Sequence, residues 1–190
     1  MKKIYIILTV TGTWLSRLIK MYTKDEFSHV SIALDSKLNE MYSFGRLKPY
    51  NPFIAGFVHE RKNKGTFKRF FNTSCVIYEL EIEDEKYNKL KSIIIDFKKK
   101  RRELSFNIIG LFLVGLNIKY RKNNSFYCAE FVKYVMDRSN INANLPIIIR
   151  PENFKNIEGT KVVYKGLLRN YSHKPVYEIM EYKKVSVKYL

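Results

Sequence analysis

The sequence predicts a single α/β (α+β) domain over residues 1–190, in which an antiparallel sheet packs against helices. The chain has 190 residues, of which 46% are hydrophobic and 28% charged, so it can bury one ordinary core. Several short segments alternate apolar and polar residues, which is the pattern of half-buried strands. In other segments apolar residues recur every three or four positions, which is the pattern of amphipathic helices.

The first part of the chain predicts two strands, a short helix and a hairpin. Residues 3–10 are an apolar strand, and residues 13–23 have helical spacing. Residues 27–35, "FSHVSIALD", alternate and are rich in strand formers, with His29 near their start. A short turn leads to residues 41–45, which we expect to be the hairpin partner of the His29 strand.

A long segment with two prolines and two glycines follows, over residues 46–73. We expect it to be irregular, with short strands at most near residues 56–60 and 66–70. A loop of this length inside one domain is often functional. At the other end of the chain, residues 172–190 keep some alternation and form a last strand or a tail.

The second half predicts strands and helices in alternation. Residues 75–82 and 161–166 have the composition of strands, and we expect both to join the sheet. Residues 83–100 and 106–116 are expected to be helices, the second of them buried. A third helix is expected over residues 128–140, with a buried face formed by Phe131, Val132, Val135 and Met136.

The formal net charge of +17 favours polyanionic partners, such as anionic lipid, wall polymers or nucleic acid. The Lys residues are scattered, however, which is typical of a solvated surface. Residues 57–71 interleave basic and aromatic side chains, a composition that suits stacking on bases. No recognised nucleic-acid module accompanies them, so an anionic surface or ligand is expected and nucleic acid is not.

Cysteine usage and hydropathy predict a cytoplasmic protein without a transmembrane segment. Two cysteines, Cys75 and Cys128, cannot form a disulfide framework. The apolar start of the chain has no cleavage site after it and resembles a strand more than a signal peptide. The apolar run over residues 108–116 is too short to span a bilayer.

Cys128 is the first candidate for chemistry, because extended residues precede it and helical residues follow it. A helix N-terminus together with a neighbouring histidine lowers a thiol pKa from about 8.5 by several units. Glu130 in the first turn complements the helix dipole. Taken alone, however, a cysteine on a helix is more often a buried apolar residue.

A thiol enzyme also needs a base and a group that orients it. His29, on an expected central strand, is the candidate base, whereas His173 lies in the tail. For the orienting group the hairpin partner offers Ser43, with Tyr42 beside it. Glu60 and His59 in the long segment are alternatives, and the residues leave this choice open.

The segments "FSHVSIALD", "YSFGR" and, far downstream, "FYCAEFV" resemble the circularly permuted papain-like superfamily. This group includes permuted relatives of the NlpC-type cell-wall peptidases and the lecithin:retinol acyltransferase-like enzymes. Its members place the histidine strand before the cysteine helix, as here. The resemblance covers about residues 5–164 and rests on two short motifs.

The resemblance implies that Cys128 is the nucleophile and His29 the base. The third position falls on Ser43, where the family more often has His, Asn, Gln or an acid. The backbone N–H of Cys128, with support from Tyr127, would stabilise the oxyanion, and Glu130 matches a Cys-x-Glu pattern of some permuted members.

The expected function is therefore cysteine-dependent hydrolysis or acyl transfer at an amide or ester bond, through a thioester. Peptide, wall-derived amide and lipid substrates remain open. No cofactor and no metal are expected, because the sequence contains neither ligand spacings nor phosphate-binding loops. The alternative is a catalytically inactive basic protein that binds nucleic acid or another polyanion.

Overall fold

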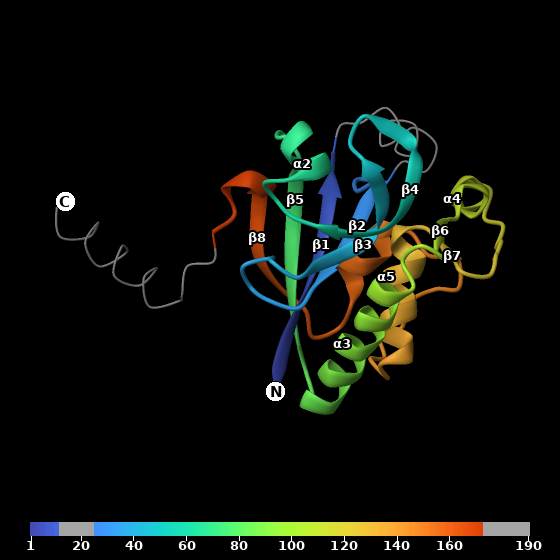
Figure 1. The fold of residues 1–190 in the computed structure, drawn as a ribbon. Helices are drawn as coiled ribbons and strands as arrows, with labels where there is room; N and C mark the ends of the chain where they lie inside the picture. Colours follow the sequence, from blue (N-terminus) through green and yellow to red (C-terminus); the bar gives the residue numbers. More distant parts are fainter. Residues whose placement is uncertain (12–24, 173–190) are drawn as a thin grey trace.

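One antiparallel sheet of six strands forms the centre of the computed structural model, which describes residues 1–11 and 25–172 (Figure 1). The strand order β4-β3-β2-β1-β5-β8 shows that the chain adds strands on both sides of β1. All neighbouring strands of this sheet run antiparallel. The strands are β1 Lys2–Val10, β2 His29–Ala33, β3 Met41–Lys48, β4 Asn51–Glu60, β5 Ser74–Ile82 and β8 Lys161–Leu167.

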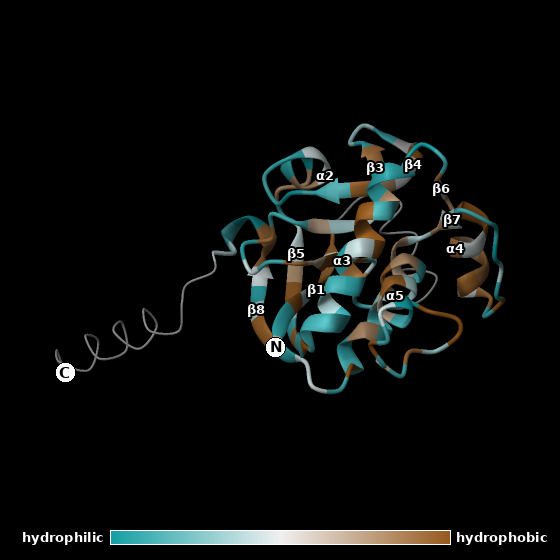
Figure 2. Ribbon diagram, turned by 60° about the horizontal axis from the view of Figure 1, so that its bottom comes forward, coloured by the Kyte–Doolittle hydropathy of each residue, from teal (hydrophilic) through white to brown (hydrophobic). Residues whose placement is uncertain are grey.

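Helices α3 and α5 cover one face of the sheet, where α5 contacts β2 and β3 (Figure 2). A parallel pair of two-residue strands, β6 and β7, precedes α4 and α5 respectively. The bounds are α2 Gly65–Arg69, α3 Asp84–Lys99, β6 Ser105–Phe106, α4 Ile108–Gly115, β7 Ser125–Phe126 and α5 Cys128–Arg138, with 3-10 turns η1 Pro151–Asn156 and η2 Leu168–Asn170. The mixed α+β class expected from the sequence is thus confirmed.

Strand β1 is buried on both faces, which explains its unbroken apolar sequence. Side chains alternate across a strand, so Ile4 and Ile6 join the core beneath α3 and α5. Tyr5 and Ile7 face the opposite side and pack with Ile77 of β5 in a second, smaller cluster. The central position of β1 between β2 and β5 produces this two-sided burial.

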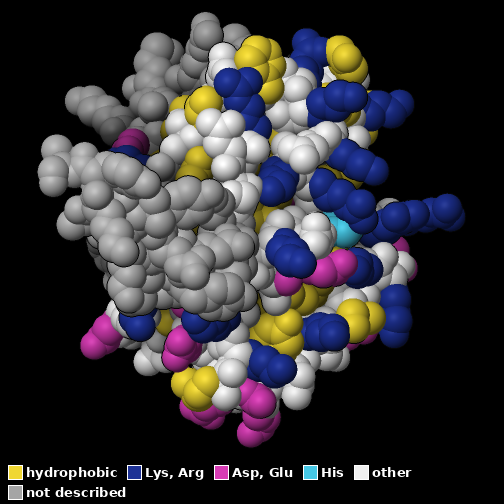
Figure 3. Space-filling view, turned by 90° about the vertical axis from the view of Figure 1, so that its left-hand side faces the viewer, with side chains coloured by type: hydrophobic (Ala, Val, Ile, Leu, Met, Phe, Trp, Pro, Cys, Tyr) yellow, Lys and Arg dark blue, Asp and Glu magenta, His cyan; other side chains and the backbone are white. Residues whose placement is uncertain are grey.

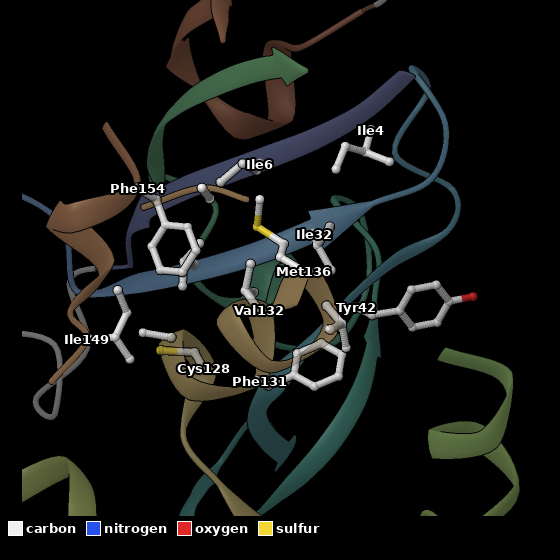
Figure 4. Packing of buried hydrophobic residues seen from close by; sticks show 14 of the residues in the cluster. Ile4, Ile6, Ile32, Tyr42, Cys128, Phe131, Val132, Met136, Ile149 and Phe154 are labelled. Carbon is white, nitrogen blue, oxygen red and sulfur yellow. The ribbon is translucent and has the colours of Figure 1, made fainter. Parts of the chain in front are cut away.

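The apolar face of α5 fills the main core, as its helical spacing predicts. Phe131, Val132 and Met136 are fully buried. Figure 4 shows Val132 and Met136 between the helix and the strands that carry Ile6 and Ile32, whereas the Phe131 ring packs against Phe44 of β3. This packing fixes α5 against β2, and therefore fixes where its first residue lies relative to the start of β2.

The expectation of an irregular segment is wrong for residues 46–55, whereas the short strand expected near residues 56–60 lies within β4. Strand β3 continues to Lys48, a tight turn follows, and β4 returns along it to Glu60. Pro49 occupies the turn, where a fixed φ is favourable. Strand β4 is the edge strand of the sheet, the position at which a proline is tolerated. The prolines therefore mark a hairpin and not a loop.

The short strand expected near residues 66–70 is also wrong, because α2 occupies this segment. Gly65 starts it with a φ of 56°, and Phe67 is its one buried side chain. A single buried residue in five fits a strand and a helical turn equally well, so the sequence pattern was ambiguous. The helix expected over residues 13–23, the tail beyond residue 172 and His173 lie outside the described residues.

None of the helices in residues 1–11 and 25–172 combines the length and the hydropathy that a bilayer-spanning segment requires.

Candidate active site

His29 and Glu60 form a nearly buried pair at the ends of two strands. His29 is the first residue of β2 and Glu60 the last residue of β4. The Nε2 atom of His29 lies 3.0 Å from Oε1 of Glu60, and the two side chains are 16% and 9% exposed. The other carboxylate oxygen, Oε2, accepts a hydrogen bond from the Ser31 hydroxyl at 2.5 Å. The carboxylate therefore holds one edge of the imidazole ring in place.

Gly45 lies next to this pair on strand β3, which separates β2 from β4 in the sheet. A Cβ atom at Gly45 would lie 3.5 Å from Cε1 of His29 and 3.6 Å from Oε1 of Glu60. A larger side chain would therefore occupy the space in which the two residues meet. Gly45 also pairs with Gly56 of β4, so this part of the hairpin carries no side-chain bulk.

Cys128 lies at the first position of α5, as the sequence predicts, and is 4% exposed. Its side chain interacts with the His29 ring by hydrogen bonding and by charge. Nε2 of the same ring faces Glu60, so the imidazole interacts with both groups. The first backbone N–H groups of a helix have no partner within the helix and carry partial positive charge. The thiol thus lies between an imidazole and a helix N-terminus.

The pKa of His29 reflects these neighbours. Burial by itself lowers the pKa of His29, but the negative charge of Glu60 and the hydrogen bond with Cys128 outweigh it and raise the pKa to about 10. At neutral pH the ring is therefore an imidazolium. This cation interacts with the Cys128 thiol, so it is the group placed to exchange a proton with it.

Ser43, the residue expected at the third position, has another role. Its hydroxyl is fully buried and donates to the backbone carbonyl of Val30 at 2.7 Å. The His29 ring instead contacts Glu60, the alternative from the long segment. Sequence reasoning preferred Ser43 because β3 is the adjacent strand, whereas Glu60 reaches the ring across β3.

Tyr42 and His59, the other candidates for the third position, belong to a different part of the hairpin. The Tyr42 ring stacks on His59 with centroids 4.8 Å apart, and its hydroxyl donates to Glu40. The His59 Nε2 atom lies 2.6 Å from the carbonyl oxygen of Asn39. These contacts stabilise the end of the hairpin. The imidazole of His29 is therefore held by Glu60 and not by Tyr42 or His59.

Replacing Ser43 with alanine is expected to lower the free energy of unfolding by about 1 kcal/mol, because it leaves the Val30 carbonyl without this donor. The rate at which Cys128 is alkylated should not change. Ser31→Ala is the matched variant, since Ser31 donates to Glu60, and it should slow alkylation. Urea unfolding and iodoacetamide labelling measure both effects. Slower labelling in Ser43→Ala would contradict the assignment of the third position to Glu60.

Tyr127 and Glu130 shape the start of α5. The Tyr127 hydroxyl is buried and donates to the carbonyl of Ile149 at 2.9 Å, and burial raises its pKa. That hydroxyl is therefore occupied, and the support for an oxyanion expected from Tyr127 has no free donor in this side chain. Glu130 accepts from the backbone N–H of Tyr127 and from Nδ2 of Asn107, each at 3.2 Å. Its carboxylate caps the helix and holds α4 beside it.

Sequence reasoning missed two of these residues. Asn107 is a buried amide whose role depends on contacts with distant segments. The residues next to it in the sequence give no sign of that role. Ser31 sits two residues after His29, so strand alternation places both on one face of β2. That spacing was the available signal for Ser31.

Cys75 provides a contrast with Cys128. It lies on β5 in the second cluster, and burial raises its pKa to about 12. Both cysteines are free. The chain therefore carries an inert thiol beside the candidate nucleophile, which makes an internal control available.

Comparison of the sequence with protein-family models and with curated proteins found no match.

Proposed function

We propose that the protein is a cysteine-dependent hydrolase or acyltransferase that cleaves an amide or ester bond through a thioester. The observation that carries this proposal is the grouping of Cys128, His29 and Glu60, in which a helix-terminal thiol contacts an imidazole held by a carboxylate. Nucleophile, proton carrier and orienting group are the three components that thiol enzymes combine.

The reaction would begin with attack of the Cys128 thiolate on the carbonyl carbon. The resulting oxyanion would accept hydrogen bonds from unpaired N–H groups in the first turn of α5. Collapse of this intermediate breaks the bond to the amine or alcohol, which takes a proton from the His29 imidazolium and leaves a thioester on Cys128. Neutral His29 then accepts a proton from water or an alcohol, which attacks the thioester, and thiolate and imidazolium are restored.

The resemblance to the circularly permuted papain-like superfamily supports the same proposal. The chain order of histidine strand and cysteine helix matches that group, and an antiparallel sheet covered by the cysteine helix is compatible with such a fold. Glu60 supplies an acid where the family favours His, Asn, Gln or an acid, which removes the departure that Ser43 would represent. The acyl donor stays open among peptide, wall-derived amide and lipid.

The first experiment is the pH dependence of alkylation by iodoacetamide, read separately for Cys128 and Cys75 by peptide mass spectrometry. We expect Cys128 to react much faster than Cys75, because the His29 ring lies beside its thiol whereas burial raises the pKa of Cys75. His29→Ala should slow this labelling at least tenfold, while Cys75 stays unreactive in both proteins. Equal labelling of Cys128 in the wild type and in His29→Ala would refute the proposed pair.

A second candidate function, binding of a polyanion without catalysis, is favoured by one observation. Arginines lie over aromatic rings around α2: Arg69 is 4.0 Å from the centre of the Tyr50 ring, and Arg169 is 5.1 Å from that of Phe71. Many Lys and Arg side chains are exposed on the face seen in Figure 3. Rings and cations in such mixtures contact bases and phosphates. Replacement of Cys128 separates the two functions, because only catalysis needs the thiol.

A further inference from the structure

Among the helices in the described part of the chain, α4 stands out by its exposed apolar side chains. It contains no charged residue, and only Gly110 and Val114 are buried. Ile109 and Phe112 are each 57% exposed. Single exposed apolar side chains are ordinary, but a contiguous group marks a site of contact. The group here comprises Ile108, Ile109, Phe112, Leu116, Ile118, Tyr120 and Ile147.

Although α4 is exposed, hydrogen bonds of Asn107 hold its first turn in place. Asn107 accepts a hydrogen bond from the backbone N–H of Gly110 at 2.9 Å, and its Nδ2 donates to the carbonyl of Tyr120 and to Glu130. A Cβ at Gly110 would lie 2.2 Å from that Nδ2 atom, so only glycine fits. The fold therefore holds the helix in a fixed place while its apolar side chains stay exposed. Figure 2 shows the helix at the rim of the molecule.

Basic residues follow the apolar helix directly. Lys119, Arg121 and Lys122 are exposed, and residues 104–129 contain no Asp or Glu. These three cations also line a cavity of about 470 Å³ between α4, the segment after it and α5. The apolar and basic side chains together are called the α4 surface below. Such a surface has the composition of an interfacial membrane segment, with apolar groups beside cations.

We propose that the α4 surface docks onto an anionic phospholipid bilayer. An eight-residue helix is far too short to cross a bilayer, so it would lie in the interface with Ile109 and Phe112 entering the acyl boundary. The cations would remain at the level of the lipid phosphates, which attract them. The positive charge beside the helix selects an anionic bilayer, and the net charge of +17 adds to this attraction.

This docking is independent of thiol chemistry, since none of its residues contacts His29 or Glu60. It can therefore hold or fail whatever the outcome of the alkylation experiment.

The apolar component is tested by flotation of the full chain with vesicles. We expect binding to phosphatidylcholine vesicles that contain phosphatidylglycerol and much weaker binding to pure phosphatidylcholine. Replacing Ile109 and Phe112 together with serine should weaken binding at least tenfold. The control is Ile95→Ser, an exposed apolar residue on α3, which should bind like the wild type. Circular dichroism checks that each variant is folded.

The basic component is tested with Lys119, Arg121 and Lys122 changed together to glutamine, which should remove the preference for phosphatidylglycerol. The same changes at Lys89, Lys91 and Lys100 around α3 keep the net charge equal and should have little effect.

Three outcomes would overturn the proposal. The first is no binding of the wild type to either vesicle. The second is full binding by the serine variant, because adsorption would then depend on charge alone. The third is concentration-dependent dimerisation that the serine variant abolishes, in a protein that does not bind vesicles. That result would make the α4 surface an interface between copies of the chain.

Discussion

Replacing Cys128 with alanine is expected to abolish acyl transfer, with a fall in rate of about a thousandfold or more. The thiol is the only group in the proposed reaction that forms a covalent bond to the substrate, and alanine offers no nucleophile. An activated aryl ester with a short acyl chain is a suitable probe, because it reports acylation without knowledge of the natural donor. The readouts are release of the aryl alcohol and the mass added to the Cys128 peptide.

The matched control is Cys75→Ala, which removes the other thiol from an equally buried position and should leave the rate unchanged. Cys128 is also packed in the core, so thermal unfolding must show that the alanine variant is folded. A Cys128→Ala protein that keeps the wild-type rate would exclude the thioester mechanism. An inactive wild type that binds polyanions, unaffected by Cys128→Ala and strongly dependent on salt, would favour the second candidate function.

Replacing Glu60 with glutamine is expected to have the next largest effect, through the pKa of His29. The carboxylate charge is the main reason that this pKa lies near 10, and burial without that charge lowers it. The pKa in the Glu60→Gln variant should therefore fall from about 10 into or below the neutral range. At neutral pH the imidazolium would be less populated, the thiolate would lose its partner, and alkylation of Cys128 should slow about tenfold or more.

The sign of the accompanying stability change follows from the same shift. The pKa of His29 is raised in the folded state above its ordinary value of 6.5, so the folded protein binds the proton more tightly than the unfolded chain. This stabilisation is fully present below pH 6.5 and is lost as the pH rises towards 10. Wild-type stability should therefore decline across this window, and the decline should be smaller in Glu60→Gln.

Nuclear magnetic resonance of the His29 ring measures the pKa directly, and urea unfolding at several pH values measures the stability. Glu79→Gln is the matched control, because Glu79 is another partly buried sheet carboxylate, paired with Tyr5 and Lys3. It should leave the His29 titration where it is. A Glu60→Gln variant whose His29 titrates as in the wild type would show that the carboxylate does not control the ring.

Local patterns were sufficient to predict the parts of the site that lie within one element. Cys128 begins a helix because extended residues precede it and an apolar helical face follows, and both signals are visible in the sequence. His29 begins a strand for a comparable reason, since alternation starts there. These patterns involve neighbouring residues only, so no knowledge of tertiary contacts was needed.

The partner of His29 could not be predicted in this way, because it depends on how three strands lie side by side. Glu60 reaches the ring across β3 next to Gly45, where an added Cβ would be in ordinary van der Waals contact with both side chains. Two glycines at paired positions of a hairpin, Gly45 and Gly56, were the available sign that side chains from other strands cross there. Because the segment after residue 45 was expected to be a loop, the pairing of Gly45 with Gly56 was not predicted.

The exposure of α4 is a second feature that the sequence pattern did not predict. Its apolar composition predicted a buried helix, as composition usually does. The structure leaves Ile109 and Phe112 exposed, because Asn107 and Gly110 fix the helix at the rim of the molecule. Hydropathy identifies which residues avoid water, but the partner that removes them from water is not encoded in the pattern.

The carboxylate of Glu130 is hydrogen-bonded both to the start of α5, which carries Cys128, and to the start of α4. One oxygen atom accepts both the backbone N–H that precedes Cys128 and the amide of the residue that caps α4. A force that pushes α4 along the surface must therefore either stretch one of these hydrogen bonds or move the first turn of α5 with it. This shared acceptor acts together with the β6–β7 pair, which joins the same two segments of the chain.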